Sequence, residues 1–288
     1  MHALKITELK KNFGKTEALK GISFSVEKGE IFGFLGPNGA GKSTTLRCIM
    51  DYIRPNEGTI SVFGKDSTAS STELKKTISY VPSEPNLYKN WSVDNHIKFV
   101  SKLQPTDKDY THQLKERLQL NSKQKVGELS TGNQQKLALV LALITSPKLL
   151  LLDEPTRGLD PLLRSELHAI LKDYQKAGGT ILLSSHDLSE VEELCNNLVI
   201  IKDGLLVTDD SIKKLKESKT HKVRVSFIGK APELSNLNIT ELVTVDKTLT
   251  FNIKGDLGGL TKQLAKYKLK DLEIVGASLE DIFMEIYN

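Results

Sequence analysis

The sequence predicts an α/β fold, in which helices cover a mainly parallel sheet, followed by a small C-terminal α+β module. Nearly continuous apolar runs at 31–35, 149–152 and 180–184 are typical of strands buried on both faces. Segments with helical periodicity separate these runs, as expected for strands that lie parallel. The length of 288 residues leaves room for one large domain and a smaller one.

The composition is that of an ordinary folded protein. It is 39% hydrophobic and 26% charged, which excludes disordered chains and coiled-coil rods. With 40 Lys and Arg against 36 Asp and Glu, the net positive charge is too small to indicate a nucleic-acid-binding surface. We therefore expect no nucleic acid partner. The two cysteines lack metal-ligand spacing and indicate a reducing compartment. We find no apolar run near the roughly 18 residues that span a bilayer and no apolar secretion signal at the N-terminus.

The elements of the first domain follow in order along the chain. Apolar positions at 4–6 and 22–26 predict short strands, and the buried run at 31–35 leads through a glycine-rich loop into a helix near 46–50. From about residue 85 to 147 the pattern is helical and indicates a helical subdomain. We expect helices at 93–103, 111–118, 132–144 and 163–174, and a further buried strand at 198–201.

A polar basic stretch at 213–224 separates the two domains, which we place at 1–215 and 216–288. Beyond this stretch, helices and strands are expected to form a small module whose helices cover one face of an antiparallel sheet. The strands are expected at 223–227, 243–245, 249–253 and 272–274, and the helices at 257–264 and 279–286.

The loop after the first buried strand reads GPNGAGKST and matches G-x-x-x-x-G-K-[ST], the phosphate loop. Glycines permit the positive φ angles that turn successive backbone N–H groups toward phosphate oxygens, and the following helix adds its positive end. A plain glycine-rich turn is a weak alternative because the run lies between a buried strand and a helix. We expect these residues to bind the nucleotide: Gly36, Pro37, Asn38, Gly39, Ala40, Gly41, Lys42, Ser43 and Thr44.

Two carboxylates follow the buried strand at 149–152. Asp153 is expected to lie beside the phosphate loop and, with the Ser43 hydroxyl, to hold Mg²⁺. Glu154 can orient and deprotonate an attacking water, and Lys42 can bridge the terminal phosphates. An apolar strand that simply ends in a turn would explain the two acids alone, but their pairing with a phosphate loop favours a catalytic role.

Four further segments resemble the motifs of ABC ATPases. The run LSTGNQQK at 129–136 is similar to the family's signature, Leu-Ser-Gly-Gly-Gln, and the runs at 156–160 and 184–187 resemble its D-loop and H-loop. Phe13 occupies the position of the aromatic residue that stacks on adenine. These motifs occur in the family's order over residues 1 to about 210. The resemblance implies a P-loop ABC ATPase domain with an antiparallel β subdomain and a helical subdomain that carries the signature.

The resemblance also implies a dimeric mechanism that uses ATP and Mg²⁺. ABC ATPases bind two ATP molecules between head-to-tail subunits, so a second ATP-binding subunit is expected, in a homodimer or a heterodimer. Ser130 and the Gly132 amide would then face the γ-phosphate held by the other subunit. His186 would contact the γ-phosphate and act in catalysis with Glu154 and Lys42.

Two departures from the family pattern stand out. The Q-loop glutamine, which usually touches Mg²⁺ and the attacking water, is replaced by Ser83 followed by Glu84. Ser83 is too short for this role, so Glu84 or a bridging water would have to act at the metal. The signature carries Thr131 and Asn133 in place of glycine and glutamine, while Ser130 is kept.

The C-terminal run ASLEDIFMEIY resembles the tail of ATP-binding subunits that serve separate exporter subunits. The resemblance therefore implies an ATP-hydrolysing exporter subunit that energises a transmembrane permease subunit. Its expected place is the cytoplasm, peripheral on the inner face of the cell membrane. The alternatives are a soluble ABC-type ATPase without a transport role and a nucleotide-gated regulatory subunit. A GTPase would need an Asn-Lys-x-Asp motif, which we do not find.

Overall fold

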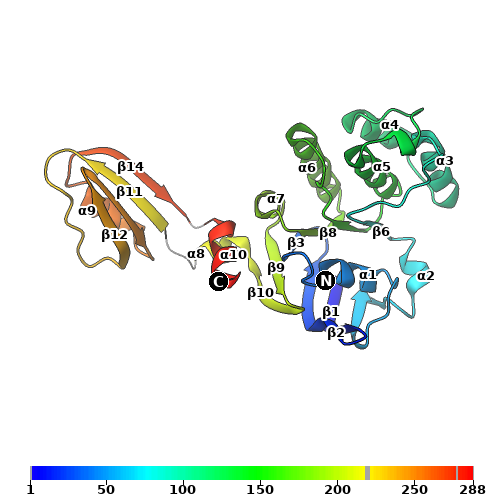
Figure 1. Ribbon diagram of the computed structural model, residues 1–288, viewed down its shortest axis with the longest axis horizontal. Coiled ribbons are helices and arrows are strands. Elements are labelled where there is room, and N and C mark those ends of the chain that lie inside the picture. The colour runs from blue at the N-terminus through cyan, green and yellow to red at the C-terminus, as the bar shows by residue number, and fades with distance from the viewer. Residues whose placement is uncertain (1, 218–220, 277, 288) are drawn as a thin grey trace. The chain divides into compact units, whose positions relative to one another are not determined.

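The computed structural model describes residues 2–217, 221–276 and 278–287 (Figure 1). The chain divides into two compact units, Met1–Asp210 and Ser211–Asn288. Parts of the basic stretch at 213–224 and of the C-terminal run at 277–287 fall outside the described residues. No helix in the described part of the chain combines the length and apolarity needed to cross a membrane.

The larger unit is built on a six-stranded sheet with the order β10-β9-β3-β8-β7-β6. Four of its neighbouring strand pairs are parallel, as the buried apolar runs predicted. The strands are β3 (Ile31–Leu35), β6 (Ile78–Val81), β7 (Leu149–Asp153), β8 (Thr180–Ser185), β9 (Asn197–Lys202) and β10 (Leu205–Ser211).

The register of this sheet places several chain segments at one edge. Leu35 pairs with Ser185, and Asp153 pairs with Ser184. Because parallel strands end at the same edge of a sheet, the loops after β3, β6, β7 and β8 all leave it together. This edge positions the candidate site.

A second, four-stranded sheet packs against the first and has the strand order β2-β1-β4-β5. Its strands are β1 (His2–Phe13), β2 (Thr16–Glu27), β4 (Glu57–Val62) and β5 (Lys65–Asp66). Phe24 on β2 packs against Phe32 and Phe34 of the central sheet, with ring centroids 5.9 and 5.3 Å apart. These aromatic contacts join both sheets in one hydrophobic core.

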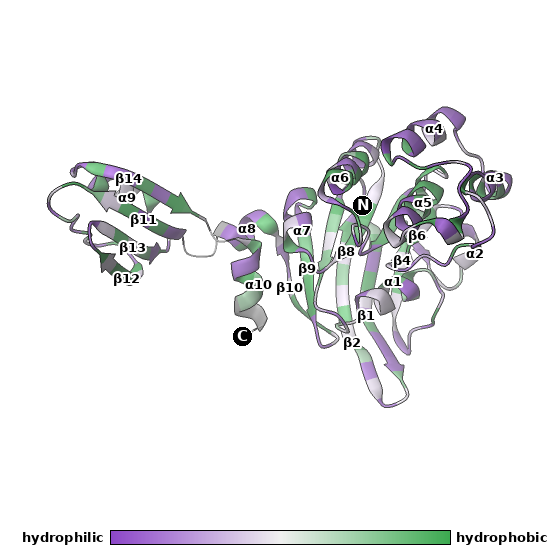
Figure 2. Ribbon diagram, turned by 45° about the horizontal axis from the view of Figure 1, so that its top comes forward, coloured by the Kyte–Doolittle hydropathy of each residue, from purple (hydrophilic) through white to green (hydrophobic). Residues whose placement is uncertain are grey.

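Helices cover the remaining surfaces of the central sheet. Figure 1 shows α5 and α6 on the face opposite α1, and Figure 2 shows that α4 is largely hydrophilic. Most of these helices begin after a serine or aspartate whose side chain accepts a hydrogen bond from a backbone N–H. The helices of this unit are α1 (Lys42–Ile49), α2 (Ser71–Leu74), α3 (Val93–Leu103), α4 (Lys108–Arg117), η1 (Val126–Glu128), α5 (Thr131–Leu143), α6 (Pro161–Lys176) and α7 (Leu188–Leu194).

The smaller unit contains an antiparallel sheet with the order β12-β13-β11-β14. The side chains of Val223, Phe251 and Leu260 lie in one core, so α9 packs on one sheet face. The last helix differs from expectation, because α10 contacts α8 and not this sheet face, which α9 already covers. The elements are α8 (Ile212–Glu217), β11 (His221–Phe227), β12 (Ile239–Val245), β13 (Thr248–Ile253), α9 (Leu257–Leu264), β14 (Leu269–Val275) and α10 (Leu279–Tyr287).

Candidate active site

A pocket of about 180 Å³ opens at the carboxyl edge of the central sheet. It brings together the phosphate loop after β3, the segment after β6 and the two acids at the end of β7. These segments are far apart in the sequence and meet because their strands share one edge. The lining residues are Pro37, Asn38, Gly39, Gly41, Lys42, Ser43, Thr44, Ser83, Asp153, Glu154 and Arg157.

Two glycines of the phosphate loop are sterically required. A Cβ on Gly36 would lie 2.5 Å from the carbonyl oxygen of Ile201, and a Cβ on Gly41 would lie 2.8 Å from that of Ala18. Gly41 also has a φ of 114°, and it immediately precedes α1. The loop therefore curls tightly against its neighbours and directs the N-terminal end of α1 into the pocket, where an anion is favoured.

Lys42 lies inside the curled loop with 6% of its side chain exposed. Its Nζ donates to the carbonyl oxygens of Gly36 and Pro37 and lies 3.5 Å from Glu154 Oε1. Burial lowers the pKa of Lys42, although the charges of Glu154 and Asp153 oppose this shift. The ammonium is thus desolvated, and phosphate oxygens can replace the two carbonyls as its partners.

Asp153 is fixed by neighbours on both adjoining strands. Its Oδ1 accepts a hydrogen bond from Ser184 Oγ at 2.9 Å, and the Tyr80 hydroxyl lies 3.5 Å from Oδ2. Burial raises the pKa of Tyr80 to about 12, and the nearby charge of Asp153 contributes to this shift. The phenol therefore keeps its proton. Neither Tyr80 nor Ser184 was predicted as a site residue.

The donor set fits Mg²⁺ better than a metal held by protein side chains alone. Among the described residues, we find no group of three or more His, Cys, Asp or Glu side chains placed to hold a metal ion. The pocket instead offers the Asp153 carboxylate and the Ser43 hydroxyl beside a phosphate loop. Mg²⁺ characteristically uses one or two carboxylates and completes its coordination with substrate phosphates and water.

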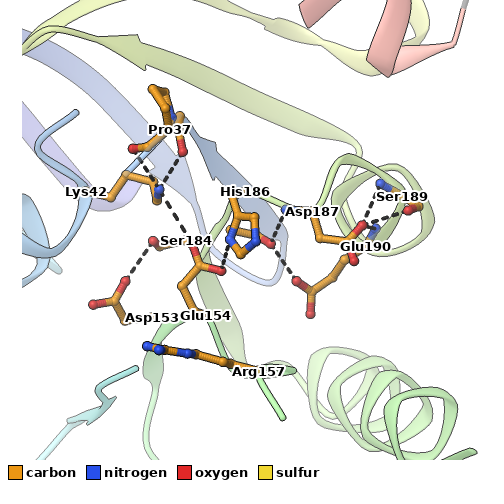
Figure 3. A network of polar contacts seen from close by, with 12 residues as sticks. Pro37, Lys42, Asp153, Glu154, Arg157, Ser184, His186, Asp187, Ser189 and Glu190 are labelled. Carbon is orange, nitrogen blue, oxygen red and sulfur yellow. Dashed lines mark hydrogen bonds and ion pairs between the residues drawn. The ribbon is translucent and has the colours of Figure 1, made fainter. Parts of the chain in front are cut away.

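Glu154 and His186 contact each other directly (Figure 3). His186 Nδ1 lies 2.5 Å from Glu154 Oε2. The Glu154 N–H donates to the carbonyl oxygen of Ser184 at 2.9 Å, and its backbone has a left-handed φ of 54°. A non-glycine residue in this conformation is held there by its surroundings, which is common at functional sites.

The segment after His186 is anchored to two helices. Asp187 accepts backbone hydrogen bonds at the start of α7, and its Oδ2 accepts from Arg164 Nη1 of α6 at 2.8 Å. Ser185 Oγ donates to the buried Glu190 at 2.7 Å. These contacts hold the loop that carries His186, and sequence patterns alone gave no signal for Arg164 or Glu190.

Three residues expected to touch nucleotide lie elsewhere in the described chain. Phe13 is half-exposed at the end of β1, with Lys11 Nζ 5.2 Å from its ring centroid. Ser130 caps α5 by accepting from the Asn133 N–H at 3.3 Å. Gly132 packs so closely that a Cβ would lie 2.4 Å from the carbonyl oxygen of Gly158. The structure thus places the signature beside the D-loop of its own chain.

The two residues at the Q-loop position, Ser83 and Glu84, have different surroundings. Ser83 lines the pocket, whereas Glu84 points to Arg157, whose Nη1 donates to Glu84 Oε1 at 3.1 Å. The buried Gln135 of the signature helix lies 3.4 Å from the Pro82 carbonyl oxygen. The pocket, the Q-loop segment and the signature helix are therefore in contact with one another.

Comparison with known proteins places this geometry in a family. Residues 19–157 match the family described as ABC transporter. The lantibiotic transport ATP-binding protein SrtF of Streptococcus pyogenes is 37% identical over 72% of this chain and 90% of its own length. The bacitracin transport ATP-binding protein BcrA of Bacillus licheniformis is 31% identical over 98% of this chain and 96% of its own.

A solved structure described as an ATP-binding subunit of an ABC transporter gives the same assignment. Its TM-score is 0.69 at 27% identity, over 74% of this chain and 92% of that chain. The fold class predicted from the motifs is confirmed by this likeness. The chain belongs to the ABC transporter family, among its ATP-binding proteins.

Proposed function

We propose that this chain is the ATP-hydrolysing subunit of an ABC exporter and energises a separate transmembrane permease. The observation that carries the proposal is the meeting of Lys42, Asp153 and Glu154 in one phosphate-loop pocket, where His186 contacts Glu154. Residues 1–215 form its ATPase domain, with the helical subdomain at about 85–147, and 216–288 form an accessory domain.

The chemistry assigned to the pocket is hydrolysis of the γ-phosphate. Glu154 accepts the proton of the attacking water, and His186 holds the carboxylate and that water in place. The water oxygen bonds the γ-phosphorus, the bond from that phosphorus to the bridging oxygen breaks, and ADP leaves. Lys42 and the amides of the phosphate loop stabilise the charge that develops on the phosphate oxygens. Ser43 and Asp153 would hold Mg²⁺, with Ser83, which also lines the pocket, as a further contact. Glu84 is paired with Arg157 and is not assigned to the metal. Bound Mg²⁺ supplies electrostatic neutralisation of the phosphates.

A second ATP-binding subunit completes the site. Ser130 and Gly132 lie outside the pocket of their own chain, so their proposed contact with ATP requires another subunit, the same chain or a different one. The N-terminus of α5 would then direct its positive end toward the γ-phosphate. Phe13 would stack on adenine from the exposed end of β1.

Export and the membrane partner follow from the relatives. SrtF and BcrA are named as lantibiotic and bacitracin transport proteins, and Nod factor export proteins of Burkholderia lata and Rhizobium also match. The exposed rings of Tyr88 and Phe99 flank Trp91, at 4.6 and 5.5 Å between centroids, and form an apolar surface for the permease. Docked there, the chain would lie on the inner face of the cell membrane.

The substitution Glu154→Gln tests the proposal. It removes the base but keeps the shape of the side chain, so ATP binding should persist while phosphate release falls by at least about 100-fold. Size-exclusion chromatography with light scattering should detect an ATP-dependent dimer of this variant. Glu116→Gln, on the exposed face of α4, is the matched control. Equal phosphate release by the Glu154→Gln variant and the parent would refute the assignment.

A further inference from the structure

The active-site pocket contains a second cation, which none of the assigned roles uses. Arg157 lines the pocket together with Lys42, Asp153 and Glu154, and Figure 3 shows it extended beside the two acids. The Arg157 N–H donates to the carbonyl oxygen of Glu154 at 3.2 Å. The guanidinium therefore projects from the same tight turn that carries the proposed general base.

The partner of this guanidinium lies outside the pocket. Arg157 Nη1 bonds Glu84 Oε1 at 3.1 Å, with exposed side-chain fractions of 60% and 80%. Ion pairs this exposed contribute little to stability because water competes for both charges. The contact between Arg157 and Glu84 is consequently easy to exchange for a stronger one.

Phosphate oxygens are a stronger partner for a guanidinium than one exposed carboxylate. Arginine presents a planar set of donors that matches phosphate oxygens in pairs, and each phosphate group of a nucleotide adds negative charge. Ser83, which lines the same pocket, has too short a side chain to reach far into it. Arg157 is thus the long polar side chain that this part of the pocket offers to a terminal phosphate.

We propose that Arg157 senses the γ-phosphate: it leaves Glu84 for the terminal phosphate oxygens when ATP occupies the pocket. The exchange frees Glu84, which is joined through a short segment to the contacting rings of Tyr88 and Trp91. The change of partner by Arg157 therefore supplies a nucleotide-dependent contact that the short side chain of Ser83 cannot make. This inference rests on the proposed ATPase function and assigns the nucleotide-dependent step to two named side chains.

Isothermal titration calorimetry with the full chain, Mg²⁺ and either AMP-PNP or ADP tests this exchange. Arg157→Ala should weaken AMP-PNP binding about tenfold, as expected for loss of a charged hydrogen bond, and ADP binding less than about twofold. Arg157→Lys should give an intermediate loss because lysine keeps the charge but not the paired donors. Glu84→Ala should strengthen AMP-PNP binding about threefold, since a weak competing ion pair is removed.

The double variant decides whether the two residues act together. In an Arg157→Ala background, Glu84→Ala should leave AMP-PNP affinity unchanged, because the competing pair no longer exists. Equal losses for AMP-PNP and ADP, or an unchanged AMP-PNP affinity in Arg157→Ala, would overturn the inference while leaving the ATPase assignment intact. Failure of the unmodified chain to bind AMP-PNP would instead overturn both. Thermal midpoints should match the parent, as both side chains are exposed.

Discussion

His186 Nδ1 and Glu154 Oε2 lie 2.5 Å apart although 32 positions separate the two residues in the sequence. The contact exists because β7 and β8 are neighbouring parallel strands and each residue directly follows its strand. The imidazole can therefore hold the carboxylate that is proposed as the base. The same carboxylate reaches Lys42 through its other oxygen, at 3.5 Å.

We predict that His186→Ala lowers ATP turnover by about 100-fold or more while ATP affinity changes only a few-fold. The reason is that the imidazole positions the base and the water, whereas Lys42 and the phosphate loop supply most of the binding. Phosphate release and calorimetric binding are to be measured on the same preparation. His112→Ala, on the exposed face of α4, should leave both unchanged. A parallel loss of binding and turnover would contradict the assigned role.

The family and the main elements were predictable because local patterns encode them. The phosphate loop, the acids after β7 and the apolar strands each occupy a continuous stretch, and the comparisons confirm the family. The strand β6 was missed because it has four residues and lies at the sheet edge, and α7 was missed because it has seven residues. Neither gives enough positions for a periodicity to be recognised.

The contacts that complete the site depend on strand register, which the sequence does not show. Ser184 meets Asp153 because β7 and β8 pair in that register, and Tyr80 approaches Asp153 from β6. The ion pair of Arg157 and Glu84 spans 73 positions, and no motif in the sequence pairs these two residues. Long-range pairs of this kind require the fold, not the motif, to be known.

We predict that Gly132→Ala disturbs the contact between the signature helix and the D-loop. The new methyl group would lie 2.4 Å from the Gly158 carbonyl oxygen, which is backbone and cannot rotate away. The free energy of unfolding should fall by about 1–3 kcal/mol, measured by urea titration. Gly258→Ala, where the added Cβ meets its nearest neighbour at 3.5 Å, should not lower it. An unchanged free energy of unfolding for Gly132→Ala would contradict the close packing of the signature helix against the D-loop.

We predict that stability declines as pH rises through the folded pKa of His168. Burial alone would lower this pKa, but hydrogen bonds and charges from Glu190 and Glu193 raise it by more, so the pKa of His168 lies above 6.5. The folded state then binds the proton more tightly than the unfolded chain, and its contribution is complete below 6.5 and is lost at higher pH. Thermal midpoints across this range provide the measurement. His168→Gln should flatten that part of the profile, and a profile as steep as the parent's would contradict the assignment.

We predict that both cysteines of the native chain react very slowly with a thiol-specific disulfide reagent. Burial raises the pKa of Cys48 to about 11, and burial with the nearby charges of Glu190 and Glu30 raises that of Cys195. The thiolate is the reactive form, so both high pKa and lack of access oppose the reaction. Absorbance of the released thiolate should indicate two reactive groups per chain in denaturant, matching the two cysteines of the sequence. Rapid labelling of the folded chain would contradict the buried placement, and labelling of single Cys48→Ser and Cys195→Ser variants would identify the exposed thiol.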